Sequence, residues 1–173
     1  MRHFIICTIL SFCLFAIGCK GLAYRSSNES MKPTINLDDM CVANPLEYVV
    51  DNIQRFDIVV FQAPEDVKER YNLNNDTRYI KRVIGLPNEK IEIKNNEIFI
   101  DDKLLVEKFE KITDENDFKK DFPPMVIPNN EYYLLGDNRP QSEDSRYWKK
   151  PTISKKNIYS EIVEIKKDFY KDK

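Results

Sequence analysis

Past residue 25, the pattern of hydrophobic and polar positions is typical of β-strands. Short runs of β-branched and aromatic residues are separated by turn residues. The pattern predicts strands over residues 40–44, 56–61, 79–84, 131–135 and 158–165. Ile91 and Ile93 alternate with charged residues, Asn95-Asn96 supplies a turn, and Ile98 and Ile100 alternate again, which predicts a hairpin with one buried face. The fold class that follows is all-β.

Three polar stretches interrupt or follow these strands. Residues 62–78 are rich in Asn and charge, which predicts a surface loop with a turn or two of helix at residues 66–72. Residues 107–121 mix Lys, Glu and Asp, which predicts a solvated loop or small flap. Residues 166–173 are charged, and we expect them to fray.

Residues 1–25 form a membrane-directed segment. No residue from Phe4 to Cys19 is charged, and the segment holds no acidic residue. The uncharged run is slightly shorter than the roughly 17–25 residues that span a bilayer. Three interpretations therefore stay open: a retained anchor, a cleaved secretion signal, or a lipoprotein signal with Cys19 as the lipidated N-terminus. Each of them places residues 26–173 outside the cytoplasmic membrane.

Composition narrows the function classes. The chain has 173 residues, 42% of them hydrophobic, which suffices for one cored domain. Its 27 basic and 29 acidic residues argue against a nucleic-acid binder. The only histidine, His3, lies next to the start, which excludes a Ser-His-Asp triad and the common zinc sites from the folded domain. Cys41 is the only cysteine past the first segment, so it has no internal disulfide partner and is expected to be a buried apolar residue.

Four motifs follow the membrane-directed segment in order. They are Ser30-Met31-Lys32-Pro33-Thr34, residues 55–61, residues 79–87, and Gly136-Asp137-Asn138-Arg139 followed by Ser142, Asp144, Ser145, Arg146, Tyr147 and Trp148. In this order and spacing they resemble the conserved motifs of bacterial type I signal peptidases, over about residues 26–148. The last motif is the most specific of the four.

The residue types make chemical sense for such an enzyme. A serine hydroxyl is a poor nucleophile unless a base takes its proton. An ordinary lysine has a pKa near 10.4, so roughly one in a few thousand is neutral at pH 7, but burial lowers that pKa. Lys81 lies in the most apolar run of the chain, where it can serve as a general base. The resemblance implies that Ser30 is the nucleophile that Lys81 activates.

The resemblance also implies supporting roles for other residues. Ser142 would hydrogen-bond Lys81. Ion pairs that hold the site would involve Asp137, Asp144, Arg146 and, as a partner, Arg82. Shallow pockets for small substrate side chains would be formed by Met31, Ile35, Tyr79 and Ile80.

The motifs depart from the family pattern at three points. Asn28 stands where a serine or threonine often assists the oxyanion hole, and we expect its amide to donate there instead. Ser26-Ser27 replaces an apolar-proline pair, and Pro140-Gln141 replaces Asp-Asn. Because Ser30 and Lys81 are both present, these departures indicate an active enzyme with a narrowed or altered substrate preference.

The resemblance implies a fold of coiled antiparallel β-sheets. Residues 1–25 would be the membrane segment, residues 26–173 the catalytic domain, and residues 95–124 a reduced second β region. The implied protein is a monomeric, membrane-associated serine endopeptidase on the extracytoplasmic side of the cytoplasmic membrane. It would contact membrane lipid and remove signal peptides from exported preproteins after small residues, through an acyl-enzyme. No metal, organic cofactor or nucleic acid would take part.

Three alternatives to a general signal peptidase stay open. One is a specialised peptidase for a single exported substrate, such as a pilin-like or conjugation protein. The second is a non-catalytic, membrane-tethered β module, which the change at Asn28 would favour. The third is a self-cleaving repressor of the DNA-damage response, which also uses a Ser-Lys pair but carries a DNA-binding domain that this chain lacks.

Overall fold

A computed structural model describes residues 21–45, 53–113 and 121–171 of the chain. Most of the predicted membrane segment, residues 1–20, lies outside the described residues. Within the described part, no helix is both long and apolar enough to cross a membrane. The described residues are mostly β-strand with one short α-helix, which confirms the all-β prediction.

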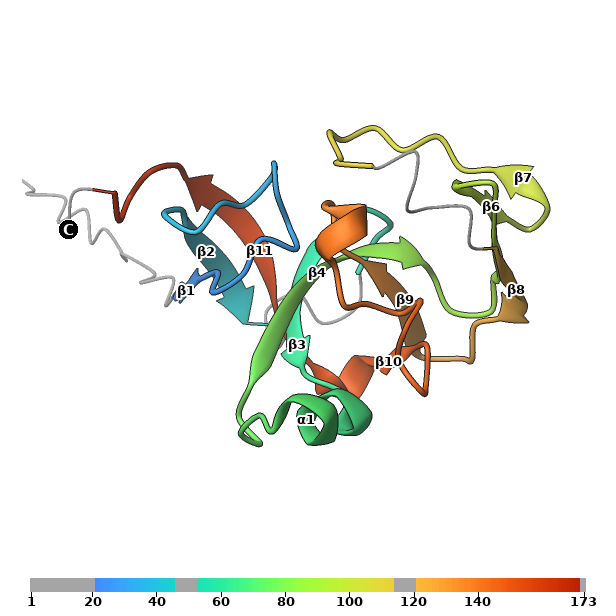
Figure 1. The fold of residues 1–173 in the computed structure, drawn as a ribbon, viewed down its shortest axis with the longest axis horizontal. Helices are drawn as coiled ribbons and strands as arrows, with labels where there is room; N and C mark the ends of the chain where they lie inside the picture. The colour runs from blue at the N-terminus through green and yellow to red at the C-terminus, as the bar shows by residue number, and fades with distance from the viewer. Residues whose placement is uncertain (1–20, 46–52, 114–120, 172–173) are drawn as a thin grey trace, which may run out of the picture.

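A seven-stranded antiparallel sheet forms the larger part of the fold (Figure 1). Its order is β1 (Leu22–Arg25), β2 (Met40–Pro45), β11 (Ile158–Lys166), β3 (Ile58–Gln62), β4 (Arg78–Gly85), β9 (Glu131–Leu135) and β10 (Ile153–Ser154). The five long strands predicted from the sequence all occur in this sheet. β1 and β10 were not predicted, because strands of four and two residues carry almost no alternation.

A four-stranded antiparallel sheet forms the smaller part and lies at the right-hand end in Figure 1. Its order is β7 (Lys103–Leu104), β6 (Glu97–Ile100), β5 (Lys90–Lys94) and β8 (Phe122–Val126). The predicted hairpin is confirmed: Ile91 pairs with Ile100 and Ile93 with Ile98. The chain enters this sheet after β4 and returns to the larger sheet at β9, which is the neighbour of β4.

Three apolar clusters form the core. β3 is buried on both faces, since Val59 and Phe61 belong to one cluster while Ile58 and Val60 belong to another. A dense apolar run without polar alternation is what such a strand needs. The third cluster joins the two sheets and is made by Ile84, Ile91, Ile93, Ile98, Ile100, Ile127, Tyr133 and Leu135. Cys41 is fully buried, as predicted.

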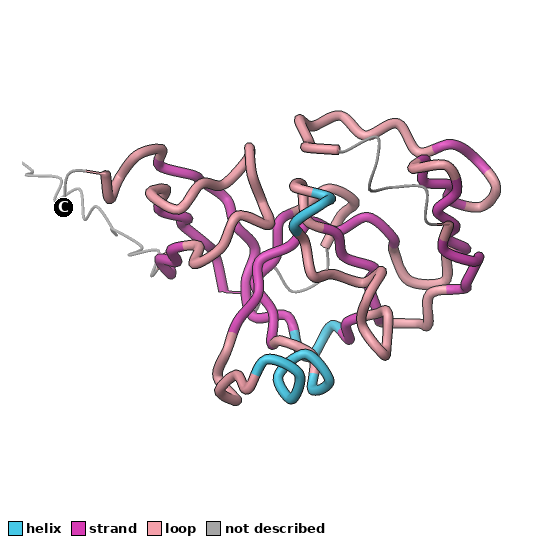
Figure 2. Tube along the Cα trace, viewed as in Figure 1, coloured by secondary structure: helices cyan, strands magenta, loops and turns pink. Residues whose placement is uncertain are grey.

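The predicted turn or two of helix at residues 66–72 is confirmed, whereas the C-terminal segment is more ordered than expected. Residues 62–78 contain helix α1 (Glu65–Tyr71), which the tube view shows below the larger sheet (Figure 2). The prediction that residues 166–173 fray is wrong for residues 166–170. The buried carboxylate of Asp39 accepts hydrogen bonds from the Lys167 ammonium (3.0 Å) and the Asp168 amide (3.0 Å), and the Tyr170 amide donates to the Asp38 carbonyl.

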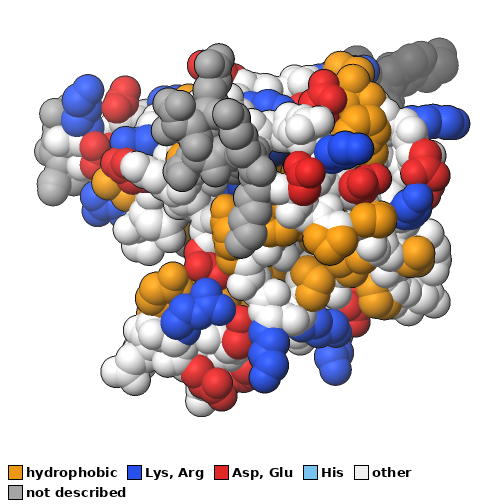
Figure 3. Space-filling view, turned by 45° about the vertical axis from the view of Figure 1, so that its right-hand side comes forward, with side chains coloured by type: hydrophobic (Ala, Val, Ile, Leu, Met, Phe, Trp, Pro, Cys, Tyr) orange, Lys and Arg blue, Asp and Glu red, His pale blue; other side chains and the backbone are white. Residues whose placement is uncertain are grey.

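The surface differs between the two parts. In the space-filling view, hydrophobic side chains gather on the half of the molecule that carries the smaller sheet, with charged side chains around them (Figure 3). Leu104, Val106 and Val126 are exposed there. The larger part also buries several charged residues, and these belong to the site described next.

Candidate active site

Ser30 and Lys81 meet at the centre of the larger sheet. Ser30 lies in the loop between β1 and β2, and Lys81 lies in β4 opposite Val59 of β3. Their side chains approach across 51 positions of sequence, with Lys81 Nζ 2.7 Å from Ser30 Oγ. Both are buried, at 1% exposure for Lys81 and 5% for Ser30. The sequence placed these two residues in separate motifs, and the fold brings them into hydrogen-bond contact.

The burial of Lys81 favours the neutral form of its amine. Desolvation lowers the pKa of Lys81 from 10.5 to about 8, against the opposing effect of Asp144, Asp137 and Glu143. Among the described residues, Lys81 forms no ion pair that would hold its ammonium form. At a pKa of about 8, roughly a tenth of the amines are neutral at pH 7, hundreds of times more than for a free lysine.

Arg82, the next residue in β4, has a very different environment. Its guanidinium donates two hydrogen bonds to the buried carboxylate of Asp137, at 2.8 and 2.6 Å, and a third to the Phe56 carbonyl at 2.8 Å. Thr34 donates to the same carboxylate. The two adjacent basic residues are therefore both buried, but only Arg82 has a carboxylate partner. In the described part of the chain, Lys81 therefore has no carboxylate partner to offset the effect of burial, which lowers its pKa.

A second buried ion pair lies on the other side of the motif. Arg146 Nε and Nη2 donate to the two oxygens of Asp144, each at 2.8 Å. Asp144 also accepts from the Gly136 amide at 3.1 Å, and Arg146 donates to the Arg139 carbonyl. The four charged residues expected to hold the site are thus brought together as two pairs around the turn at Gly136.

That turn holds the Ser30 loop directly. The Asn138 amide donates to the Ser30 carbonyl at 3.0 Å, and the Asn138 side chain donates to the Glu29 carbonyl at 3.1 Å. Gly136 is required by the close approach, because a β-carbon there would lie 2.5 Å from the Ser30 carbonyl oxygen and 2.2 Å from Ser142 Oγ. We did not single out Asn138 and Thr34 from the sequence, although both lie within the quoted motifs.

Two expected contacts are absent from this structure. Ser142 Oγ is buried beside Gly136 and has no hydrogen-bond partner among the described residues, so the expected bond to Lys81 is not formed. The Asn28 side chain is an acceptor rather than a donor: its Oδ1 receives the Ser30 amide at 3.1 Å. The oxyanion role of Asn28 stays a prediction that requires this side chain to turn.

The four residues expected to form substrate pockets divide into two pairs. Tyr79 and Ile80 border a small cavity of about 30 Å³ beside Ser30, whose other walls are polar: Arg25, Ser26, Ser27, Asn28 and Arg78. Met31 and Ile35 are instead buried in the core with Val60 and Ile162. Both lie in the turns between β1 and β2, and neither lines the cavity beside Ser30.

A segment of the smaller part crosses the turn at Gly136. The Ile112 amide donates to the Asp137 carbonyl at 2.9 Å, and the Ile112 carbonyl accepts from the Arg139 amide at 2.9 Å. The Glu107 side chain is only 5% exposed and forms an ion pair with Arg139. The segment is a loop with Lys108 and Glu110 exposed, as the expectation of a solvated loop or small flap requires, but Glu107 and Ile112 contact the Gly136 turn. This contact could not be predicted from the sequence, because the residue types of a buried ion pair are the same as those of a solvated one.

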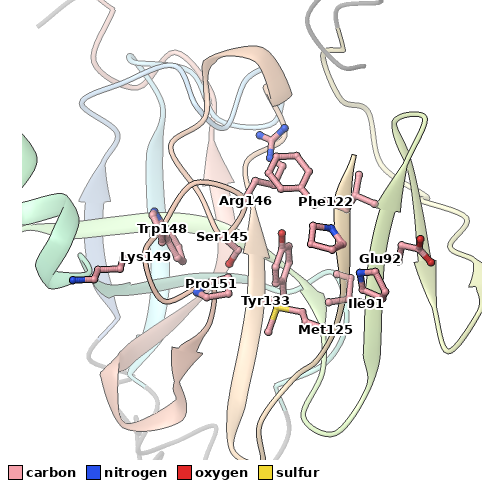
Figure 4. Close-up of a pocket in the computed structure, with 13 residues that line it drawn as sticks. Ile91, Glu92, Phe122, Met125, Tyr133, Ser145, Arg146, Trp148, Lys149 and Pro151 are labelled. Atoms are coloured by element: carbon pink, nitrogen blue, oxygen red, sulfur yellow. The ribbon is translucent and has the colours of Figure 1, made fainter. Parts of the chain in front are cut away.

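A larger cavity of about 350 Å³ lies between the two sheets (Figure 4). Ile91, Phe122, Met125, Tyr133 and Trp148 contribute to its lining. Neither Ser30 nor Lys81 lines it, so the wider opening and the dyad are separate features. The geometry beside Ser30, not the larger volume, marks the candidate active site.

Comparisons with known proteins agree with this geometry. The family model "Signal peptidase, peptidase S26" matches residues 1–165. Signal peptidase I P of Bacillus subtilis subsp. natto is 35% identical over 129 residues, which are 71% of this chain and 65% of that protein. Signal peptidase I of Bacillus caldolyticus is 32% identical over 158 residues, 83% of this chain and 76% of that protein.

The fold agrees as well. The crystal structure of a signal peptidase I from Enterococcus faecalis V583 matches with a TM-score of 0.52 and 27% identity, covering 66% of this chain and 99% of that one. The matched region is slightly less than two thirds of the length of several curated relatives, such as the 63% for the probable signal peptidase I-2 of Synechocystis. With its motifs, its fold and the family model in agreement, the chain belongs to the signal peptidase family, peptidase S26.

Proposed function

We propose that this chain is a serine endopeptidase that removes signal peptides from exported preproteins. The observation that carries the proposal is the 2.7 Å contact between Ser30 Oγ and the buried Lys81 amine, whose pKa is lowered to about 8. A buried amine in contact with a serine hydroxyl is the arrangement that proton transfer requires. The relatives named signal peptidase I support the same activity.

The reaction follows from the positions of these two side chains. Ser30 Oγ attacks the carbonyl carbon of the scissile peptide bond while the neutral Lys81 amine takes the hydroxyl proton. The tetrahedral intermediate collapses as Lys81 returns that proton to the leaving amine, which leaves an acyl-enzyme on Ser30. Water then attacks the ester, with Lys81 again accepting and returning the proton. No cofactor is needed, because the pair supplies both nucleophile and base.

Substrate selection would take place beside Ser30. Tyr79 and Ile80 form the apolar part of the small cavity there, which suits small side chains before the cleaved bond. Asn28 would assist the oxyanion if its side chain turns to present its amide. Residues 1–25 would keep the catalytic domain at the extracytoplasmic face of the membrane, where a monomer meets preproteins as they emerge.

The polar lining of the cavity favours a second candidate function. Ser26, Ser27 and Asn28 border it together with two arginines, Arg25 and Arg78. A largely polar cavity accepts apolar side chains less readily than an apolar pocket. This observation supports a specialised peptidase for one exported substrate, which would cleave few members of a preprotein panel.

The test is cleavage of a panel of preproteins by the purified full chain in detergent. Wild type is expected to cut after a small residue, and Ser30→Ala and Lys81→Ala are each expected to lose at least about a thousandfold in kcat/KM. Ser154→Ala and Lys94→Ala are matched controls that lie away from the dyad and should cleave as wild type does. Cleavage at full rate by Lys81→Ala would contradict the proposed mechanism, and an inert wild type the proposed activity.

A further inference from the structure

Helix α1 contacts the loop that follows the turn at Gly136. The helix lies between β3 and β4, so it belongs to the connection that leads into the strand of Lys81. Arg70 Nη1 lies 3.1 Å from one carboxylate oxygen of Glu143, and Tyr71 Oη donates to the other at 3.1 Å. Both oxygens of this carboxylate are therefore held by one short helix. We call Arg70, Tyr71 and Glu143 the α1 clasp.

The position of Glu143 makes this contact relevant to the dyad. Its neighbours in sequence are Ser142, whose buried Oγ has no hydrogen-bond partner among the described residues, and Asp144, which is fully buried. Ser142 Oγ and the Ser30 carbonyl both lie against Gly136. A shift of the Glu143 backbone would therefore move Ser142 relative to the nucleophile.

A second contact ties the same helix to the same loop. Asp66 in the first turn of α1 accepts a hydrogen bond from the Lys149 amide at 2.9 Å, and it also pairs with Arg70 at 3.2 Å. The loop from residue 142 to residue 149 is thus attached to α1 at both ends. The helix is too short to be stable alone, so these contacts with the loop are mutual supports.

We propose that the α1 clasp positions the Ser142–Asp144 segment against the Ser30–Lys81 dyad, and that Glu143 is a positioning residue for catalysis. This inference rests on the proposed peptidase activity. It assigns a function to α1 and to the residue between Ser142 and Asp144, neither of which touches the nucleophile. Arg70 and Tyr71 hold Glu143, and Glu143 in turn fixes the backbone on both sides of it.

The charge of Glu143 gives the clasp a measurable signature. Asp144, Asp137 and Glu143 raise the pKa of Lys81 and Arg146 lowers it, while burial remains the largest influence. Asp144 and Asp137 are neutralised by their own arginines, Arg146 and Arg82, which leaves Glu143 as the carboxylate that can be changed without unpairing a buried charge.

Near the Lys81 amine lie also the Ile80 carbonyl, which accepts its hydrogen bond at 3.1 Å, the Tyr79 ring and Ser30. The Tyr79 ring, on the same strand, lies 5.2 Å from Nζ, and burial raises the pKa of its hydroxyl, which keeps it neutral. Ser30 contributes only its hydroxyl. Replacing Glu143 by glutamine should therefore lower the pKa of Lys81 further, because one of its attractive negative charges is removed.

The experiment compares Glu143→Gln, Arg70→Gln and the double variant in the full chain. Glu143→Gln keeps the shape and an acceptor but removes the charge, so the acidic limb of kcat/KM should move to lower pH by a few tenths of a unit to about one unit. Arg70→Gln should lower kcat roughly two- to tenfold with little change in KM, and the double variant should lose no more than Arg70→Gln alone. Glu69→Ala, an exposed acidic residue of the same helix, is the matched control.

A direct titration keeps this inference separate from the proposed activity. The Lys81 amine is followed by NMR against pH in wild type and Glu143→Gln, which requires no substrate. A downward shift in Glu143→Gln supports the clasp even if no preprotein is cleaved. An unchanged Lys81 titration together with a wild-type kcat in Arg70→Gln would overturn it, whereas an inert wild type with a shifted titration would count only against the peptidase activity.

Discussion

Both sheets have apolar cores, but the larger one also buries a group of charged side chains. The smaller sheet packs isoleucines from β5 and β6 against Ile84 and Leu135 of the larger one, without a buried ion pair in that cluster. The larger sheet buries Lys81, Arg82, Asp137, Asp144 and Arg146 around one turn. Buried charges in ion pairs contribute little net stability, and replacing them by apolar residues is often neutral or stabilising. The buried charges of the larger sheet therefore contribute to the geometry of the site more than to stability.

The two regions are joined through residues 107–112, which cross the turn at Gly136. The Arg82 guanidinium lies over the Phe109 ring at 4.1 Å, and Phe109 packs edge-on against Phe56. One face of the buried arginine is thus covered by the smaller part, while its hydrogen bonds go to the larger part. The smaller region therefore shields the charged network from water, although it supplies none of the dyad.

The largest expected effect comes from unpairing a buried charge. Asp137→Ala leaves the Arg82 guanidinium buried without its carboxylate, which should cost about 3–5 kcal/mol of unfolding free energy. Urea unfolding measures it. Asp102→Asn removes an exposed ion pair with Lys90 in the smaller part and keeps a residue type suited to the positive φ at this position, so it should cost less than about 1 kcal/mol. Equal losses in the two variants would remove the distinction between the regions.

Alanine substitutions at two glycines distinguish the effect of displacing the site from the effect of disturbing the apolar core. Gly136→Ala places a methyl group 2.5 Å from the Ser30 carbonyl oxygen, so the backbone must move and kcat/KM should fall about a hundredfold. Gly85→Ala meets Ile127 Cδ1 at 2.3 Å, which is the end of a flexible side chain in the cluster between the sheets. We expect Gly85→Ala to lower the melting temperature and to keep most of its activity. Comparable kcat/KM values for the two variants would show that the turn tolerates displacement.

The pH dependence tests the buried lysine. With the pKa of Lys81 at about 8, kcat/KM should fall about tenfold for each pH unit below that value. Between about 8 and 10.5 the unfolded state binds more protons at this residue than the folded state, so its contribution to stability rises with pH across that window.

Lys81→Met is the control for this linkage, because it removes the titrating amine while keeping an unbranched side chain. Its unfolding free energy should lack the rise between about pH 8 and 10.5 that wild type shows. Denaturant unfolding at several pH values measures the difference. Parallel curves for the two proteins would mean that Lys81 titrates as an ordinary exposed lysine.

The smallest expected effect concerns the contact between the two regions. Phe109→Leu keeps an apolar side chain but removes the ring beneath Arg82, which should cost about 1 kcal/mol of stability. Thermal unfolding and cleavage rates are measured together. A loss of kcat far greater than this would mean that the smaller region acts on the dyad and does more than shield it.

Much of the fold was predictable from local pattern. The isoleucine alternation at residues 91–100 gave the correct hairpin register, because a slip of one residue would move every isoleucine to the solvent face. The apolar runs at β3 and β4 predicted strands, and their ends were correct within two residues. Helix α1 was predicted only as a turn or two within a loop, because seven residues carry little periodicity.

The site was predictable as a set of residues and not as a set of contacts. Ser30, Lys81, Asp137, Asp144 and Arg146 were identified through motif order, and the fold brings all of them together. The sequence could not show that Asn28 accepts from the Ser30 amide or that Ser142 lacks a partner, because side-chain rotamers depend on packing. Nor could it show that the Glu107 side chain is buried against Arg139.

The sequence by itself determined which chemistry is possible: a serine, a lysine in an apolar strand, and no histidine in the domain. Only the tertiary structure decided that this lysine is buried in contact with Ser30 and has a lowered pKa, as the proposed base requires. Its pKa falls because the fold buries the amine, an effect that exceeds the opposing influence of Asp144 and Asp137, which are each paired with an arginine of their own. Desolvation and charge pairing are properties of the folded arrangement, since they depend on atoms that are distant in the chain and adjacent only in space.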